Sequence, residues 1–392
     1  MAILNSIAQS HEEMTAWRRE MHQHPEICYE EFWTSDYVAG QLESFGIEVH
    51  RGLGKTGVVG ILRGQGDNQA AICVRADMDG LPMQEANEFE YKSKTDGRMH
   101  ACGHDGHMAM LLGAAKYLAQ TKQFDGTVYF IFQPAEEGGA GAKAMMEDGL
   151  FEKFDVEHVW GMHNWPGLET GKIAIHDGAC MASADHFRIT ISGRGSHAAM
   201  PHQSQDPIIA AAALVQNLQS VVARQIDPLD AAVVSVTALN GGSAYNVIPD
   251  EAELRGTARA LRPETRQTVQ EAIRRMTRQI CDAYEVTADV VWHVGYPPTV
   301  NHAKEADHAA SIAGEVVGMP NIVRNPSASM GAEDFAYMLE ARKGAYIWIG
   351  GGEAQAGKML HNTSYDFNDD ILPIGASYWA RLVEVSLPLS EV

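Results

Sequence analysis

The sequence is poor in cysteine, in basic residues and in long apolar runs, and each shortage excludes a class of protein. Its 392 residues include five cysteines, an odd number that is too thinly spread for the disulfide framework of a small secreted domain. Thirty Lys and Arg stand against 51 Asp and Glu, a formal net charge of −21, and such a surface repels phosphate backbones and anionic lipid. No apolar stretch reaches the roughly 18 residues that span a bilayer. We therefore expect no nucleic-acid partner and no membrane partner.

The first residues, 1–6, also lack the basic region and apolar run that are typical of a signal peptide. Together with the few cysteines, this makes the cytoplasm the expected compartment. A hydrophobic fraction of 45% is ordinary for a globular protein, and the length predicts one large domain or two to three smaller ones. The residue type in excess is histidine, with 17 copies.

The first half of the chain alternates short apolar segments with helical patterns. Residues 70–74, 127–132 and 156–160 have the pattern of buried strands, and residues 108–118 carry apolar side chains at helical spacing. This alternation predicts an α/β fold with a mostly parallel sheet and helices on both of its faces. In such sheets ligands bind beyond the carboxyl ends of the strands, so the residues that follow each strand are the first site candidates.

From about residue 184 the pattern changes to the β-α-β-β-α-β order of a ferredoxin-like module. The expected strands cover residues 186–192, 233–239, 251–260 and 286–292, and the expected helices begin at Pro207 and Pro263. We therefore predict a catalytic domain in two parts, residues 1–183 and 295–392, and an inserted satellite domain of residues 184–294.

Residues 52–57 match the Gly-x-Gly-x-x-Gly pattern of dinucleotide-binding folds, with Asp77 about 20 residues further on. Residues 58–62, however, have the pattern of a strand, so no helix N-terminus follows to receive a pyrophosphate. We interpret the segment as a hairpin turn and expect no nucleotide.

Residues 100–107 contain three histidines, a cysteine and an aspartate directly before a helical pattern. One such histidine would most simply be a cap or a surface group, but this density predicts a metal site. Cys102 would bind as a thiolate and His104 as a neutral imidazole. His107 lies one helical turn beyond His104, and its role is left open between support of a ligand and structure.

Three further side chains follow predicted strands. Glu136 and Glu137 come after the strand at 127–132, and adjacent carboxylates on a turn point in different directions, so one can bind a metal while the other faces a water molecule. His163 follows the next strand, and His361 lies where a returning strand would bring it to the same edge. Each signal is weak alone, since acidic turns are common in so acidic a chain, but together they predict a metal centre.

The charges favour two divalent ions over one. Cys102 and Glu137 would contribute two negative charges and the three histidines none, so two divalent cations and a hydroxide leave about one positive charge in surplus. That surplus polarises a carbonyl and lowers the pKa of water from ~15.7 toward ~7. Glu136 would take the proton and pass it to the leaving amine. A Cys/His/Glu set accepts zinc, manganese, cobalt or nickel, so the metal is left open.

Over nearly its whole length the chain resembles the M20 metallopeptidases, in particular the amidohydrolase branch with the hippurate hydrolases and the plant auxin–amino acid conjugate hydrolases. The matching motifs cover residues 17–26, 75–82, 100–107, 133–138, 193–197, 246–250 and 331–335 and the segment around His361. The resemblance implies a dinuclear-zinc aminopeptidase-like α/β catalytic domain. It also implies a ferredoxin-like α+β satellite domain, which in this family often mediates dimerisation, so a homodimer or higher homo-oligomer is expected.

The resemblance further implies roles for single residues of the catalytic domain. Cys102 would bridge two metal ions, with Glu136 as the general base. The remaining ligands would be His104, Glu137, His163 and His361. Asp77 stands where other branches of the family have a metal-binding histidine, so we do not count it as a ligand, and Asp79 is expected to support the ligands from behind.

In the inserted domain the resemblance implies three substrate contacts. His197 would reach into a partner subunit's site and stabilise the oxyanion, while Asn246 and Arg259 would hold the carboxylate of the substrate, for which a guanidinium fork is suited. The residues alone favour a plainer interpretation for two of them, in which His197 is an exposed turn residue and Arg259 a solvent-facing strand residue.

We predict a metal-dependent hydrolase that cuts the amide of N-acyl amino acids, such as N-acetyl or N-benzoyl conjugates, and releases a carboxylic acid and a free amino acid. One alternative is a thiol-dependent amidase with Cys102 as the nucleophile and His104 as the base, which leaves the other candidate ligands without a role. A second alternative is a catalytically silent binding protein on the same scaffold, against which the presence of both Glu136 and Glu137 argues.

Overall fold

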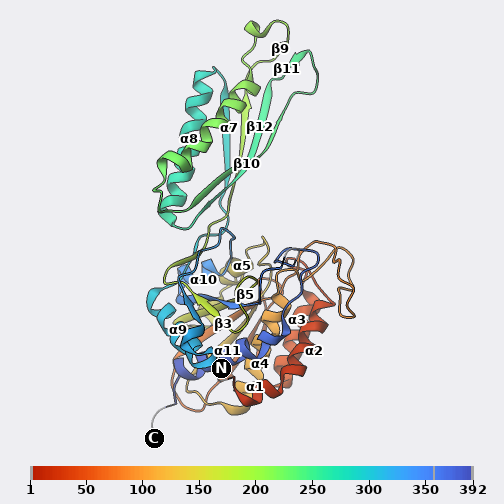
Figure 1. The fold of residues 1–392 in the computed structure, drawn as a ribbon, viewed down its shortest axis with the longest axis vertical. Helices are drawn as coiled ribbons and strands as arrows, with labels where there is room; N and C mark the ends of the chain where they lie inside the picture. The colour runs from red at the N-terminus through yellow and green to blue at the C-terminus, as the bar shows by residue number, and fades with distance from the viewer. Residues whose placement is uncertain (1–2, 356–357, 390–392) are drawn as a thin grey trace. The chain divides into compact units, whose positions relative to one another are not determined.

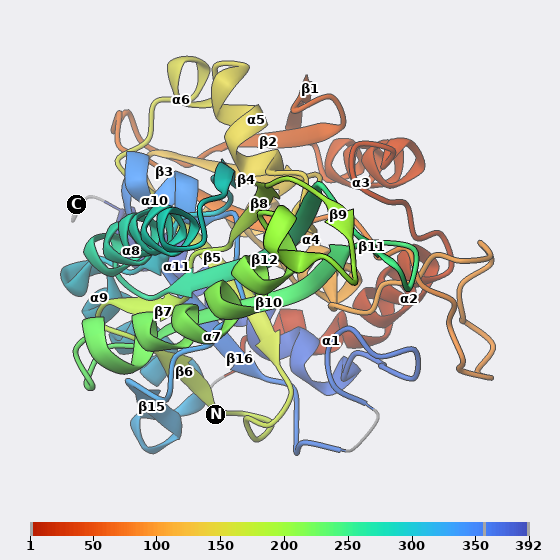
Figure 2. The ribbon, with the colours of Figure 1, turned by 90° about the horizontal axis from the view of Figure 1, so that it is seen from above.

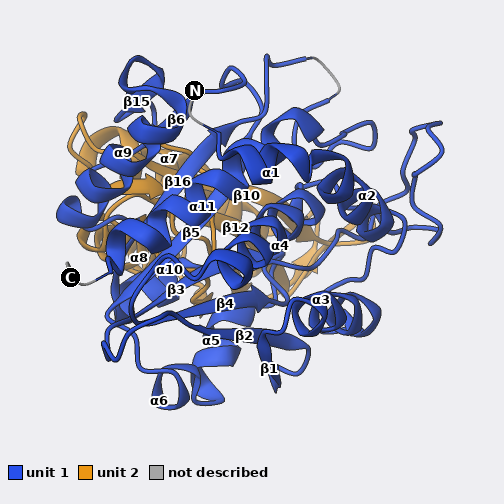
Figure 3. Cartoon of the chain, turned by 90° about the horizontal axis from the view of Figure 1, so that it is seen from below, with its two compact units in different colours: residues 1–178, 300–327, 334–392 blue, residues 179–299, 328–333 orange. Residues whose placement is uncertain are grey.

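The computed structural model describes residues 3–355 and 358–389, and the chain divides into two compact units. Unit 1 comprises Met1–Gly178, Val300–Ser327 and Asp334–Val392, and unit 2 comprises Ala179–Thr299 and Ala328–Glu333 (Figure 3). The range predicted for the inserted domain lies within unit 2.

Residues 328–333 differ from the prediction, which placed them in the second part of the catalytic domain, because they belong to unit 2. Met181 and Ser329 form a parallel bridge, and the N–H of Ala182 donates to the carbonyls of Ser329 and Gly331. These backbone contacts tie the short segment to the start of unit 2.

An eight-stranded sheet forms the centre of unit 1, in the order β1-β2-β4-β3-β5-β16-β6-β15 (Figure 1). Its strands are β1 (Glu48–Leu53), β2 (Gly57–Arg63), β3 (Ala71–Asp77), β4 (Thr127–Gln133), β5 (His158–Trp165), β6 (Ile173–Ile175), β15 (Ile322–Arg324) and β16 (Lys343–Gly350). The four central strands, β4, β3, β5 and β16, run parallel, as predicted. Antiparallel pairing is confined to the sides, where β1 and β2 form the hairpin expected in place of a nucleotide-binding loop.

Helices cover both faces of this sheet. They are α1 (Asn5–Gln9), α2 (His11–His22), α3 (Phe32–Ser44), α4 (His104–Thr121), α5 (Gly141–Glu147), α6 (Leu150–Lys153), α9 (Ala303–Val317), α10 (Ala336–Ala341) and α11 (Leu372–Ser386). The views show α4 and α11 on one face and α5 and α10 on the other (Figures 1 and 3). Strand β3 is buried at every position and α4 on nearly all sides, which explains why apolar residues predominate in both.

Unit 2 has the predicted β-α-β-β-α-β order. Its elements are β8 (Asp185–Ser192), α7 (Pro207–Gln225), β10 (Ala232–Gly241), β12 (Glu251–Ala260), α8 (Pro263–Ala283) and β13 (Thr287–His293). The strands form an antiparallel sheet in the order β10-β12-β8-β13, with α7 and α8 side by side on one face (Figures 1 and 2). Asp206 caps α7 by accepting a hydrogen bond from the N–H of Ile208 at 2.9 Å.

A small ribbon of β9 (Ser196–His197) and β11 (Val247–Ile248) also belongs to unit 2.

Among the helices of the described ranges, none has both the length and the apolar character needed to cross a bilayer.

Candidate metal centre

The polar side chains of the site lie at one edge of the unit 1 sheet, where the parallel strands end. They are Asp79 after β3, Glu136 and Glu137 after β4, His163 near the end of β5, and Cys102 and His104 at the start of α4. Because β3, β4 and β5 run parallel, their carboxyl ends meet at the same edge, which is where open α/β sheets bind ligands.

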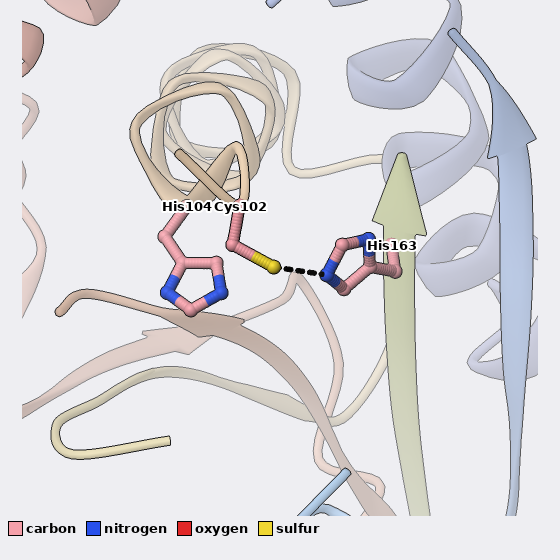
Figure 4. Close-up of side chains that lie close together, drawn as sticks. All are labelled: Cys102, His104 and His163. Atoms are coloured by element: carbon pink, nitrogen blue, oxygen red, sulfur yellow. Dashed lines mark hydrogen bonds between the residues drawn. The ribbon is translucent and has the colours of Figure 1, made fainter. Parts of the chain in front are cut away.

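The first group of candidate ligands consists of Cys102, His104 and His163, each of which is buried. One ligand atom of each lies within 4.8 Å of the others, and Cys102 Sγ is 3.3 Å from His163 Nε2. Figure 4 shows the sulfur of Cys102 pointing toward His163 on its strand, while the ring of His104 projects from the start of α4 on the other side of the cysteine.

Both imidazoles of this group are oriented by hydrogen bonds to backbone carbonyls. His104 Nδ1 donates to the carbonyl of Asp79 at 2.8 Å, and His163 Nδ1 donates to the carbonyl of Asn164 at 2.6 Å. A neutral imidazole held in this way presents the lone pair of Nε2, as metal-binding histidines do. Within the described part of the chain, Nε2 of His104 forms no hydrogen bond although it is buried, so it lacks a partner that a cation would supply.

A second group consists of Cys102, Glu137 and His361, whose ligand atoms also lie within 4.8 Å of one another. Nε2 of His361 is 3.1 Å from Oε1 of Glu137, and the backbone N–H of His361 donates to the carbonyl of Ala101 at 2.8 Å. Cys102 is common to both groups, so its sulfur lies between two sets of donors.

The electrostatic field at this edge favours cations. Burial raises the pKa of the Cys102 thiol well above its usual value, and the carboxylates of Glu137 and Glu136 raise it further. Burial alone lowers the pKa of His104, but the carboxylate of Asp77 and its other acidic neighbours outweigh that effect and raise it to about 10. An excess of negative charge binds protons, and a divalent cation can replace them. The donor set therefore fits a metal.

Asp79 anchors the ligands from behind. Its Oδ1 accepts a hydrogen bond from the N–H of Glu136 at 3.0 Å and its Oδ2 from the N–H of Glu137 at 2.9 Å. Its carbonyl receives the hydrogen bond from His104 described above. One side chain thus fixes the turn that carries both glutamates and the ring of one histidine.

His107, whose role the sequence left open, belongs to a buried hydrogen-bond network. Its Nδ1 donates to Asp77 Oδ1 at 2.6 Å, and its Nε2 accepts from the N–H of Asn164 at 3.0 Å. Asn164 Nδ2 also donates to the hydroxyl of Tyr365 at 2.6 Å. Both ring nitrogens of His107 are therefore engaged. The sequence analysis missed Asn164 and Tyr365, and the only available signal was their closeness in sequence to His163 and His361.

Arg75 is a further buried residue to which the sequence assigned no role. Its guanidinium donates to Gln133 Oε1 at 2.7 Å, to Asp77 Oδ2 at 2.8 Å and to Asp334 Oδ1 at 3.1 Å. Asp334 Oδ2 also accepts from the N–H of Ala142 at 2.9 Å. The network links the ends of β3 and β4 to the loop before α10.

Two of the candidates in unit 2 lie together and the third lies apart. The N–H of Ala198, next to His197, donates to the carbonyl of Asn246 at 2.9 Å, so the β9–β11 ribbon holds both exposed candidates. The ribbon extends beyond the end of the sheet at which β12 begins (Figure 1). Arg259 lies at the other end of β12, eight residues from Glu251, which corresponds to roughly 25 Å of strand.

The guanidinium of Arg259 is half-buried, and burial lowers its pKa. In the described ranges it makes no hydrogen bond and no ion pair. A partly desolvated cation without a partner is suited to bind an anion.

Comparisons with known proteins point to one family. The family described as Peptidase family M20/M25/M40 matches residues 73–385. The chain is 44% identical to the hippurate hydrolase of Campylobacter jejuni, and the alignment covers 97% of this chain and 98% of that protein. It is 39% identical to the N-acetylcysteine deacetylase of Bacillus subtilis, and that alignment covers 96% of this chain and 97% of that protein.

A solved structure shows the same fold. It is a Bacillus subtilis protein described as a dinuclear metal binding peptidase from the M20 family, with a TM-score of 0.84 and 34% sequence identity. The alignment covers 97% of this chain and 99% of that one.

Proposed function

The chain belongs to peptidase family M20/M25/M40, and we propose that it is a metal-dependent amidohydrolase that cleaves N-acyl amino acids into a carboxylic acid and a free amino acid. The observation that carries the proposal is the position of Cys102, whose sulfur belongs to two groups of candidate ligands at the edge of the sheet. The names of the similar proteins support the substrate class, since a hippurate hydrolase and an N-acetylcysteine deacetylase are among them.

Two divalent cations fit the donor set. In our assignment Cys102, His104, Glu137, His163 and His361 would hold them. The oriented lone pairs of His104 and His163 and the excess of carboxylates support this set. Its mixed sulfur, nitrogen and oxygen donors suit zinc, manganese, cobalt or nickel.

When bound, the cations polarise the scissile carbonyl and lower the pKa of water. Glu136 then acts as the general base, takes the proton of the attacking water and delivers it to the leaving nitrogen. Its side chain is buried beside that of Glu137, and Asp79 fixes the backbone of both residues. A carboxylate held at a fixed place avoids the entropic cost of positioning a base during the reaction.

Arg259 and Asn246 are assigned to the carboxylate of the substrate and His197 to the oxyanion. The guanidinium of Arg259, which is partly buried and has no partner among the described residues, supports its assignment to the carboxylate. Because roughly 25 Å of strand separates Arg259 from the β9–β11 ribbon, a single chain cannot bring both to one small substrate. We therefore propose that the ribbon serves the site of a second subunit and that the chain forms a homodimer, or a higher homo-oligomer, through unit 2.

The proposed compartment is the cytoplasm. The five cysteines are all free, as is typical of a reducing environment.

The test is a hydrolysis screen with N-acetyl and N-benzoyl amino acids after loading the protein with zinc, manganese, cobalt or nickel. We expect release of the carboxylic acid, loss of activity with EDTA and recovery when metal is restored. Activity that survives EDTA but not iodoacetamide would support the thiol amidase instead. Failure to hydrolyse any substrate of the class with any of the metals would support a silent binding protein.

A further inference from the structure

Four rings form a continuous stack beside the candidate metal centre. The rings of His163 and Trp165 meet edge to face, with centroids 6.0 Å apart and an interplanar angle of 76°. Trp165 lies flat on Trp348, with centroids 3.8 Å apart and planes only 3° from parallel. His176 then meets Trp348 edge to face at 4.7 Å.

The backbone holds this stack in place. His163 and Trp165 are two residues apart on β5 and so project from the same face of the strand. Trp348 is the partner of His163 in the parallel register of β16 and β5. The carbonyl of Trp165 accepts hydrogen bonds from the N–H of Gly351 at 3.0 Å and of Leu168 at 3.2 Å. The Trp165 ring is therefore a fixed surface.

The two tryptophans differ in exposure. Trp348 is only 3% exposed, so packing in the core accounts for it. Trp165 is half-buried, and Trp348 covers just one of its faces, which leaves aromatic surface free at the end of β5. This is the edge of the sheet at which the candidate ligands gather, and ligand sites are typically lined by such aromatic side chains.

The stack suits the uncharged end of the proposed substrate. The amino acid end carries a carboxylate and needs a cation such as Arg259. The stack instead offers the free ring face of Trp165, which carries no charge. Planar acyl groups gain from offset or edge-to-face contacts with such rings, whereas an acetyl group is too small to gain much.

We propose that Trp165 is a specificity-determining residue that contacts the acyl group and favours aromatic acyl groups over small aliphatic ones. The proposal rests on the proposed function and deepens it. The metal ligands alone do not determine whether an aromatic or a small acyl group is preferred, and the proposal assigns this preference to Trp165.

The test compares kcat/KM for N-benzoyl-alanine and N-acetyl-alanine in the metal-loaded enzyme and its variants. Trp165→Leu should lower the value for the benzoyl substrate at least about tenfold and that for the acetyl substrate less than about threefold. Trp165→Phe, which keeps a ring, should retain most of the preference. An equal loss on both substrates would overturn the proposal, and so would a change in amino acid preference at a constant acyl group.

Trp33 offers a matched control, because it is also half-buried and stacked. Its ring lies between His24 at 4.1 Å and Tyr37 at 5.0 Å, on α3, and none of these three residues belongs to a group of candidate ligands. Trp33→Leu should leave the ratio of the two kcat/KM values unchanged. If it shifts that ratio as Trp165→Leu does, the effect is general and the proposal is wrong.

A binding measurement separates this proposal from the proposed function. Calorimetric titration of the metal-loaded protein with benzoate and with acetate should show that Trp165→Leu weakens benzoate binding at least about fivefold and leaves acetate unchanged. If the wild-type protein hydrolyses no N-acyl amino acid, the proposed function fails, yet this titration still decides the role of Trp165. Absence of benzoate binding, or equal binding by wild type and variant, overturns it.

Discussion

Cys102 Sγ and His163 Nε2 lie 3.3 Å apart, although 61 positions separate the two residues in the sequence. Two atoms bound to one tetrahedral zinc at its usual bond lengths would lie roughly 3.5 Å apart. The lone pair of His163 is free to point toward the sulfur because Nδ1 is engaged with the carbonyl of Asn164. The pair is therefore already close to the spacing of two ligands of one cation.

The first prediction concerns the shared sulfur. Cys102→Ala removes a donor from both groups of ligands, so the metal content should fall from about two ions per chain to one or none, and activity should be lost. Elemental analysis of purified protein measures the metal. Cys73→Ala is the matched control, because Cys73 is equally buried in β3 but belongs to neither group. Full metal content and activity in Cys102→Ala would contradict the assignment.

The second prediction separates the base from the ligands. Glu136→Gln keeps the size of the side chain but removes its basicity, so kcat should fall at least about 100-fold while both metals remain bound. The neighbouring substitution Glu137→Gln should instead reduce metal content. Steady-state kinetics and elemental analysis on the two variants test this contrast. Substantial activity in Glu136→Gln would remove the proposed mechanism.

The third prediction concerns the support provided by Asp79. Asp79→Asn places an amide N–H₂ against one of two backbone N–H groups, so the turn that carries both glutamates should loosen. We expect metal affinity about 10- to 100-fold weaker in titrations with a competing chelator, with most of kcat restored at saturating metal. Asp125→Asn changes another buried aspartate that accepts a backbone hydrogen bond, and it should leave the affinity unchanged because Asp125 lies before β4, at the opposite end of that strand from the two glutamates. Equal affinities in all three proteins would refute this role.

The fourth prediction concerns stability and pH. His22 is buried between Asp105, 2.8 Å from its Nδ1, and Glu85, 3.2 Å from its Nε2. Burial alone lowers the pKa of His22, but the hydrogen bonds to the two carboxylates outweigh this effect and raise the pKa from its ordinary value of 6.5 to about 9. Because the pKa of His22 is higher in the folded state, protonation of His22 stabilises the folded protein. This contribution is complete below pH 6.5 and is lost as the pH rises through about 9.

The contribution of His22 to the free energy of unfolding is roughly 3 kcal/mol at its maximum. Denaturant unfolding of the metal-loaded protein should therefore show a gap between wild type and His22→Gln that narrows between pH 6.5 and 9. His308→Gln should show no such narrowing, because burial lowers the pKa of His308 instead. Parallel curves for wild type and His22→Gln across this window would contradict the prediction.

The sequence predicted the fold well where its patterns are local. The family is confirmed, and so are the α/β class and the hairpin at residues 52–57, whose turn lies between β1 and β2. The roles of the ligands, of Glu136 and of the unit 2 residues stay predictions until they are tested.

Prediction was weaker where function overrides the apolar pattern. The strand expected at 156–160 begins at His158 and runs on to Trp165. The apolar pattern did not predict its last residues because they include the polar His163 and Asn164, which lie at the candidate site. The buried networks were missed for a different reason. Arg75 and Gln133 are 58 residues apart and Asn164 and Tyr365 are 201 apart, so no local pattern links such partners.

The most direct test of the metal centre is anomalous diffraction from crystals of the active protein, recorded at the absorption edge of the metal that it contains. The account predicts two peaks per chain, each within about 2.5 Å of the sulfur of Cys102. A single peak, peaks that do not contact Cys102, or fully active crystals without any transition metal would contradict it.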